Sequence, residues 1–105
     1  MSSTADASDF VFQDEKDASR YTLTRGGELL SVLDYRDDGS AVAMTRAYTI
    51  PIHRGRGYAA LVTEHAVSDV EARGDRRIVP VCWYVADWFD AHSDKRHLLR
   101  RGADS

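Results

Sequence analysis

Arg54-Gly55-Arg56-Gly57-Tyr58-Ala59 divides the sequence into a strand pattern before it and a helix pattern after it. Glycines let the backbone turn tightly and approach a ligand with no side chain in between. The first turn of the following helix leaves N–H groups unpaired at the positive end of the helix dipole, which suits a pyrophosphate. Arg54 and Arg56 would add charge-assisted contacts. The spacing alone leaves a second interpretation open, a glycine-containing connector with two solvated arginines.

A helix is predicted after this loop, over about residues 58–73. Apolar side chains recur along it at helical spacing, namely Ala59, Val62, Ala66 and Val70. Gly74 follows the last turn, where a left-handed C-terminal cap is expected. The compact apolar run over residues 78–85 then predicts a buried strand. It should be parallel to the strand before the loop, because a strand–helix–strand unit crosses over in that way.

Four strands are predicted before the loop, and they cover residues 10–12, 20–24, 29–35 and 40–50. Arg25-Gly26-Gly27 and Asp38-Gly39 supply turns between them, since glycine tolerates the positive φ of tight turns. Trp88-Phe89 and Leu98-Leu99 indicate one or two short closing helices. The predicted order is therefore β-β-β-β-α-β-α, in one small domain of the α/β (α+β) class.

Length and composition limit the interpretation further. A chain of 105 residues fits one domain, which we place at residues 10–101, with disordered tails over residues 1–9 and 102–105. The net charge of −3 argues against nucleic-acid binding through bulk charge. Cys82 is the one cysteine, so an intramolecular disulfide is excluded. Neither a signal-peptide pattern nor a membrane-spanning apolar run occurs, and we expect a cytoplasmic protein that does not bind membranes.

Two nucleotide-binding motifs can be set aside. The segment from Gly55 to Ala60 also fits G-x-G-x-x-A, but that fingerprint requires an acidic residue about 20 positions on, at the end of the next strand. Arg76-Arg77-Ile78 occupies that stretch, and only 48 residues follow Gly57, too few for a doubly wound nucleotide domain. A P-loop is absent too, because no Gly-Lys-Ser/Thr occurs.

Two motifs together carry a family resemblance. The loop resembles the R/Q-x-x-G-x-G/A acetyl-coenzyme A loop of the GNAT N-acetyltransferases. Val81-Cys82-Trp83-Tyr84, which begins 22 residues after Ala59, resembles the Cys-Trp-Tyr segment of the small YjdJ-like branch of that superfamily. The resemblance extends over about residues 20–99, which is most of the chain.

The resemblance implies a mixed, twisted sheet whose two central parallel strands splay apart. The pantetheine arm of acetyl-coenzyme A would enter this gap, and its amides would pair with backbone near Thr49 and Ile50. The pyrophosphate would rest on the loop at residues 54–59. The thioester would then point toward the strand that carries Cys82, and its acetyl group would pass to an amine.

The sequence departs from the family pattern at two places. Arg46-Ala47-Tyr48 stands where members often carry His-Thr-Glu, so no catalytic histidine is carried over to these positions. Ser93 follows His92 where members tend to have proline, so a substrate contact that rests on that turn is not carried over either.

Three side chains are candidates for the chemistry. On the predicted strand Cys82 would share a face with Ile78, Pro80 and Tyr84. A thiolate is a strong nucleophile, so Cys82 could accept the acetyl group itself; the other interpretation is a small core residue. By the resemblance, Tyr84 could protonate the leaving coenzyme A sulfur. His92 could act as a base at the mouth of the site.

The remaining histidines and aromatic residues are assigned simpler roles. No histidine pair has metal-ligand spacing, so we predict no metal site. His65 should lie at the surface or at the core boundary of its helix, and His53 should either contact phosphate or be solvated. Trp83, Trp88 and Phe89 are predicted to belong to the core.

The leading hypothesis is an enzyme that transfers acetyl from acetyl-coenzyme A to an amine. The alternatives are a coenzyme A-binding protein without turnover, such as a sensor, and an interaction module that keeps only the fold. So short a domain lacks the strands and loops with which larger members shape an acceptor pocket. The acceptor is therefore left open between a protein lysine, a protein N-terminus and a small polyamine. We expect a monomer or a weak dimer.

Overall fold

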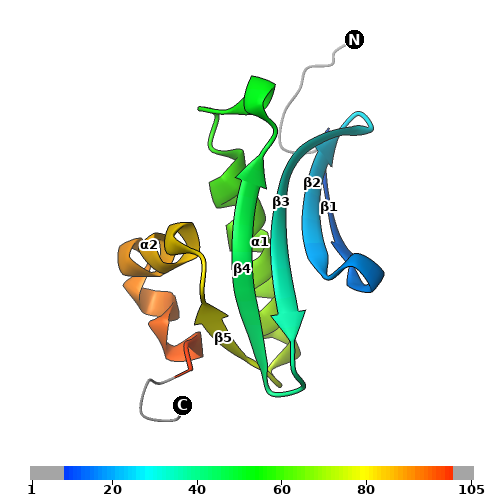
Figure 1. Cartoon of the computed structure of the whole chain (residues 1–105). Helices are drawn as coiled ribbons and strands as arrows, with labels where there is room; N and C mark the ends of the chain where they lie inside the picture. Colours follow the sequence, from blue (N-terminus) through cyan, green and yellow to red (C-terminus); the bar gives the residue numbers. More distant parts are fainter. Residues whose placement is uncertain (1–8, 101–105) are drawn as a thin grey trace.

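The computed structural model describes residues 9–100 as one sheet with helices on one side (Figure 1). The sheet has the strand order β1-β2-β3-β4-β5. Its strands are β1 (Phe10–Glu15), β2 (Arg20–Arg25), β3 (Glu28–Asp37), β4 (Ala41–Thr49) and β5 (Arg77–Pro80). The first four pair antiparallel, and β5 pairs parallel with β4. This arrangement confirms the predicted order of elements; the predicted tails, apart from Asp9, lie outside the described residues.

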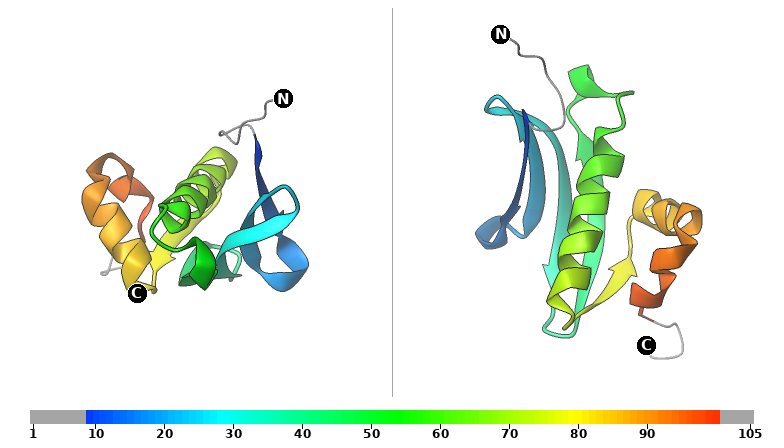
Figure 2. Two further views of the ribbon diagram at one scale, coloured as in Figure 1. Left: turned by 90° about the horizontal axis from the view of Figure 1, so that it is seen from above. Right: turned by 180° about the vertical axis from the view of Figure 1, so that it is seen from behind.

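The helices form a second layer over one face of this sheet. The two α-helices are α1 (Tyr58–Arg73) and α2 (Trp83–Ala91), and short 3-10 helices lie at η2 (Lys16–Ala18), η3 (Pro51–His53) and η4 (Ser93–Leu98). Figure 2 shows α1 across the strands and α2 next to α1, beside the edge strand β5. One hydrophobic core joins them to the strands, since Val67 of α1 and Phe89 of α2 belong to the same buried cluster as Met44.

Helix α1 has the predicted bounds because glycines stand at both of its ends. Gly57 precedes it with φ +80°, and Gly74 follows it with φ +72° and donates its N–H to the carbonyl of Val70. Both conformations are left-handed, where glycine meets no Cβ penalty. Of the predicted stripe, Val62, Ala66 and Val70 are fully buried, and Ala59 in the first turn is half-buried.

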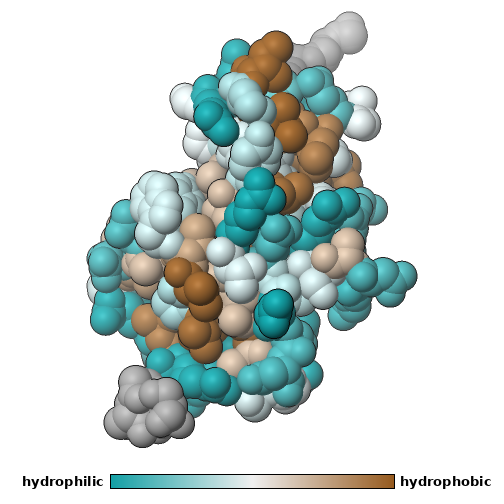
Figure 3. Space-filling model, viewed as in Figure 1, coloured by the Kyte–Doolittle hydropathy of each residue, from teal (hydrophilic) through white to brown (hydrophobic). Residues whose placement is uncertain are grey.

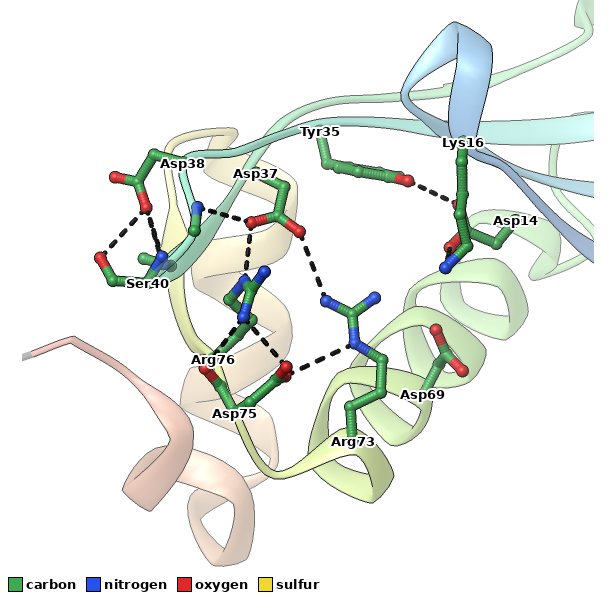
Figure 4. Close-up of polar contacts among 12 residues, drawn as sticks. Asp14, Lys16, Tyr35, Asp37, Asp38, Ser40, Asp69, Arg73, Asp75 and Arg76 are labelled. Atoms are coloured by element: carbon green, nitrogen blue, oxygen red, sulfur yellow. Dashed lines mark hydrogen bonds and ion pairs between the residues drawn. The ribbon is translucent and has the colours of Figure 1, made fainter.

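The far end of α1 is tied to the β3–β4 hairpin by ion pairs (Figure 4). Asp37 pairs with Arg73 at 3.4 Å and with Arg76 at 2.7 Å. Asp38 accepts the backbone N–H groups of Ser40 and Ala41, and these bonds hold the pKa of its carboxyl at about 2. The hairpin is thereby fixed against the end of α1 and the start of β5.

Strand β4 has a bulge half-way along, and only its first half pairs with β5. Its register with β3 shifts between Asp34–Arg46 and Tyr35–Met44, so Thr45 is an extra residue that forms a bulge. A bulge bends its strand and increases the local twist. The pairing with β5 ends at Met44 and Pro80. Within residues 9–100, no strand pairs with the outer side of residues 45–49, which we call the free edge of β4.

The predicted strand over residues 78–85 is wrong in its second half. The strand β5 ends at Pro80, which has no N–H to continue the ladder, and α2 begins at Trp83. Cys82 therefore precedes a helix and does not share a strand face with Ile78, Pro80 and Tyr84. The core assignment is confirmed for Trp88 and Phe89, whereas Trp83 is 74% exposed.

Candidate functional site

The glycine loop lies between η3 and α1, with open space above it. Gly55 and Gly57 have φ of +86° and +80°, so both positions require glycine for their backbone conformation. A Cβ built on either glycine would meet no atom of the chain within 4 Å. A ligand can therefore approach the loop backbone directly.

The start of α1 offers unpaired donors to such a ligand. The first helical hydrogen bond runs from the N–H of Leu61 to the carbonyl of Gly57, at 3.1 Å. The N–H groups of Tyr58, Ala59 and Ala60 precede it, and they have no acceptor among residues 9–100. No side chain from the described part of the chain caps the helix. Three convergent N–H groups at the positive end of a helix dipole fit a pyrophosphate.

The two loop arginines are exposed beside these donors. Among residues 9–100, Arg54 makes one long hydrogen bond, from Nε to the carbonyl of Thr49 at 3.4 Å, and its guanidinium lies 5.7 Å from the ring centre of Tyr48. Arg56 has no ion-pair partner in the described part of the chain. Both side chains can therefore turn toward phosphate groups without breaking a strong contact.

Residues from the β2–β3 hairpin contact the two ends of the loop, at Tyr58 and His53. The sequence analysis did not predict these contacts. Arg25 donates from Nη2 to the buried hydroxyl of Tyr58 at 3.0 Å. His53 pairs through Nε2 with Glu28 Oε2 at 2.7 Å. Arg25 and Glu28 flank the Gly26-Gly27 turn, far from the loop in sequence, and no motif links them to it. The ring of Tyr58 thus faces the hairpin, so its N–H is what it offers to a ligand.

The backbone of the free edge of β4 faces away from β3 at alternate residues. Ile50 donates its N–H to Leu30 at 2.9 Å, and its carbonyl accepts from the N–H of His53 at 2.8 Å. Because hydrogen-bonded and non-hydrogen-bonded pairs alternate along an antiparallel ladder, the N–H and C=O of Thr49 and Ala47 point outward. Of the two predicted residues, Thr49 therefore presents its backbone groups to the gap, where its carbonyl accepts the long bond from Arg54 Nε, whereas both backbone groups of Ile50 are bonded within the chain.

Cys82 lies at the inner end of this edge. Its N–H donates to the carbonyl of Met44 at 2.9 Å, and its own carbonyl accepts from Ala86 in the first turn of α2. Its side chain is half-buried and packs against the hydrophobic core. The thiol can therefore line the gap, and its packing also suits a small core residue.

Tyr84 and His92 line a surface hollow of about 340 Å³ on α2, which we call the α2 hollow. Its lining residues are Ala60, Trp83, Tyr84, Asp87, Trp88, Ala91 and His92. Burial raises the pKa of Tyr84 above its usual value of 10.0, so the phenol remains a proton donor at neutral pH. His92 stacks on Trp88 at 3.9 Å and donates from Nδ1 to the carbonyl of Trp88 at 2.7 Å. This bond leaves Nε2 of His92 as the acceptor.

The three candidate side chains do not form one cluster. Tyr84 and His92 share the α2 hollow, and Ala60 connects that hollow with the first turn of α1. Cys82 does not line it. A rise of 1.5 Å per residue separates Cys82 and His92 by roughly 15 Å along α2. Proton transfer between His92 and the Cys82 sulfur would therefore need a chain of intervening water molecules.

The other histidines have ordinary contacts. His65 is half-buried, as predicted, and stacks on Phe12 with ring centres 4.5 Å apart. Within residues 9–100, no three histidine, cysteine, aspartate or glutamate side chains gather in a way that could hold a metal ion. In the same part of the chain, no helix combines the length and apolar character needed to cross a membrane.

Residues 20–98 match the family described as GCN5-related N-acetyl-transferase. The chain belongs to this family. The matched segment begins with β2 and ends with η4, so it includes the glycine loop, the free edge of β4 and both α-helices. Membership in a family of N-acetyltransferases supports acyl transfer as the activity. No curated protein matches the chain.

Proposed function

We propose that this member of the family binds acetyl-coenzyme A along the free edge of β4 and transfers its acetyl group to an amine. The observation that carries the proposal is the end of the parallel ladder at Met44 and Pro80, below a loop with three unpaired N–H groups. An extended ligand with amide groups and a pyrophosphate matches an unpaired strand edge that leads to a helix N-terminus.

The binding contacts follow from this arrangement. The pyrophosphate would accept the N–H groups of Tyr58, Ala59 and Ala60 and the side chains of Arg54 and Arg56, over Gly55 and Gly57. The pantetheine amides would pair with Thr49 and Ala47, because both backbone groups of Ile50 already have partners in the chain. The acetyl group would then lie near Met44 and Cys82, where the gap closes.

Acetyl-coenzyme A supplies a thioester that an amine can attack. In direct transfer the amine nitrogen forms a bond to the acetyl carbon, the carbon–sulfur bond breaks, and the thiolate leaves. In this proposal Tyr84 gives that thiolate its phenolic proton, and water between the gap and Nε2 of His92 takes the proton of the amine; both side chains line the α2 hollow. In the alternative route the Cys82 sulfur accepts the acetyl group first, releases coenzyme A, and then passes the acetyl group to the amine.

We propose, from the resemblance of the Cys82-Trp83-Tyr84 segment, that the chain is a member of the small YjdJ-like branch.

A second candidate function is coenzyme A binding without turnover. It is favoured by the contacts of Arg46-Ala47-Tyr48, which supply neither an acid nor a base beside the gap, and by the packing of Cys82 against the core. The same binding site serves both functions, so they differ only in turnover.

Two measurements separate these functions. Native mass spectrometry with coenzyme A tests binding, and we expect one bound molecule per chain. A thiol reagent then follows the release of coenzyme A from acetyl-coenzyme A in the presence of peptide amines. Binding with amine-dependent thiol release supports the transferase. Binding without release in any amine mixture supports the second function, and absence of binding contradicts both.

A further inference from the structure

One face of the sheet carries no helix from residues 9–100. Because α1 packs on the other face and α2 lies next to it beside β5, strands β1 to β4 themselves form the surface seen in Figure 1. We call it the open face. Its hydrophobic residues form separate groups, near the upper end and near β5, with hydrophilic residues between them (Figure 3). The surface between those groups is therefore polar, and its charges decide what can dock there.

Strand pairing identifies the side chains on the open face. Tyr21 points toward α1, because its hydroxyl donates to Asp69 of that helix at 2.7 Å. Successive side chains alternate between faces, so the neighbouring row, Arg20–Asp34–Arg46, lies on the open face. The same alternation places Glu15 there, opposite Arg20, and Arg36 next along β3.

This face is basic although the whole chain has a net charge of −3. Arg20, Arg36 and Arg46 lie there together with the carboxylates of Glu15 and Asp34. Glu15 pairs with Arg20 at 2.9 Å and Asp34 with Arg46 at 3.6 Å. The side chain of Arg46 is still 60% exposed, and Arg36 has no ion-pair partner among residues 9–100. The excess of exposed guanidinium groups favours an anionic partner.

The open face also leads to the site where the acetyl group would lie. Arg46 is two residues from Met44, whose carbonyl holds Cys82 at the inner end of the gap. The helices α1 and α2 cover the opposite side of β4. A large amine-bearing molecule can therefore reach the gap across the open face, and it must pass Arg46 and Tyr48 to do so.

We propose that the open face docks the acceptor, and that the acceptor amine belongs to an acidic polypeptide segment. This inference rests on the proposed function, and it selects a protein amine over a polyamine, whose positive charges the arginines would repel. Neighbouring strands are about 4.8 Å apart, so the row from Arg20 to Arg46 spans about 10 Å. An extended peptide covers that distance in about three residues. Carboxylates within a few residues of the acceptor amine would thus meet guanidinium groups, which bind them in bidentate geometry.

Peptide binding tests the proposal without turnover and without coenzyme A. Two fluorescent peptides of equal length carry one lysine, flanked either by glutamate and aspartate or by glutamine and asparagine. Fluorescence anisotropy at low salt should give the acidic peptide at least about tenfold tighter binding, since charge complementarity governs such contacts. Equal affinity of the two peptides would overturn the proposal.

Two charge reversals locate the surface. Arg46→Glu should weaken binding of the acidic peptide by about fivefold or more, because it replaces an attraction by a repulsion. Arg96→Glu is the matched control, since Arg96 is 53% exposed, forms one ion pair with Asp90 at 3.0 Å, and lies on η4 away from the open face. Equal losses in the two variants would contradict the proposal. Tighter binding of single-stranded RNA than of the acidic peptide, sensitive to Arg46→Glu, would overturn it in favour of nucleic acid.

The two proposals fail in different experiments. Coenzyme A binding is measured by calorimetry, and Arg36→Glu should leave it within about twofold of the wild-type value, because Arg36 lies on β3, outside both the loop and the free edge of β4. Absence of coenzyme A binding to the wild-type chain would contradict the proposed function. Absence of any preference for the acidic peptide, with coenzyme A still bound, would contradict this inference alone.

Discussion

Cys82 donates its backbone N–H to the carbonyl oxygen of Met44 at 2.9 Å, directly beyond the point where β4 and β5 stop pairing. This bond closes the lower end of the free edge of β4 and fixes where α2 begins. Because the backbone makes it, the position of residue 82 does not depend on its side chain. The sulfur can therefore be replaced without moving the strand or the helix.

Cys82→Ser tests the route of acetyl transfer. We expect the variant to fold and to bind coenzyme A like the wild type, with a small loss of stability because a half-buried hydroxyl needs a hydrogen bond. If transfer passes through the sulfur, intact mass and peptide mapping will find acetyl on Cys82 of the wild type after incubation with acetyl-coenzyme A, and no adduct in the variant. Acetylated lysines in both proteins, without an adduct on Cys82, would instead indicate direct transfer.

Tyr84→Phe tests the proton donor. Burial raises the pKa of Tyr84, so the phenol keeps its proton throughout the neutral range and its contribution to the rate should not decline below pH 10. Removal of the hydroxyl should lower kcat about 100-fold, as loss of a general acid does, and leave the KM for acetyl-coenzyme A nearly unchanged. Tyr35→Phe is the control, because the hydroxyl of Tyr35 donates to Asp14, outside the proposed site. An unchanged kcat in Tyr84→Phe would exclude this role.

The loop arginines should make coenzyme A binding depend on salt. Arg54→Gln combined with Arg56→Gln should weaken the affinity and flatten its decrease with ionic strength, because the screened charge contacts are gone. The control combines Arg20→Gln with Arg96→Gln, two exposed arginines that lie outside the loop. Calorimetry between low and high salt gives the slopes. The wild-type slope in the loop variant would mean that these arginines are solvated and that the loop is a simple connector.

The hydroxyl of Tyr21 joins the sheet to α1 through Asp69, and its loss should destabilise the fold. Tyr21→Phe should lower the free energy of unfolding by about 1–2 kcal/mol, because Asp69 loses its donor. Burial and the neighbouring carboxylate of Asp69 raise the pKa of Tyr21 in the folded state, so folding favours the protonated form. Wild-type stability should thus be complete below about pH 10 and fall as the pH rises further, whereas the variant should lose less.

Urea denaturation at several pH values measures both effects. Tyr48→Phe is the control here, because the hydroxyl of Tyr48 makes no hydrogen bond to the part of the chain that the structure describes. If the free energy of unfolding of Tyr21→Phe and of Tyr48→Phe falls equally above pH 10, ionisation of Tyr21 does not cause the loss of stability at alkaline pH.

The sequence predicted α1 and its loop well because local signals fixed both. Gly57 and Gly74 mark the ends of the helix, and the apolar residues between them recur at helical spacing along its whole length. The misassigned region, residues 81–85, has no such signal. Its apolar side chains suit a strand as well as a helix, and only Pro80 and the spacing of Val85 and Phe89 favour the helix.

The parts of the site that depend on pairing register could not be predicted. Nothing in the composition of β4 marks Thr45 as the bulged residue, since the shift appears only when β3 is placed beside it. The same holds for the support of Tyr58 by Arg25 and for the gathering of Arg20, Arg36 and Arg46 on one face. These contacts join residues distant in sequence, so they follow from the sheet and not from a motif.

The most direct test of the coenzyme A site compares the two glycines that flank α1, Gly57 before the helix and Gly74 after it. Gly57 and Gly74 both have left-handed backbones, and a Cβ at either would meet no atom within 4 Å, so alanine should cost each about 1–2 kcal/mol of stability. Only Gly57 lies under the proposed pyrophosphate. Calorimetric titration with coenzyme A should show at least tenfold weaker binding for Gly57→Ala, about 1.4 kcal/mol or more, and unchanged binding for Gly74→Ala. Equal affinity in the two folded variants would contradict the site.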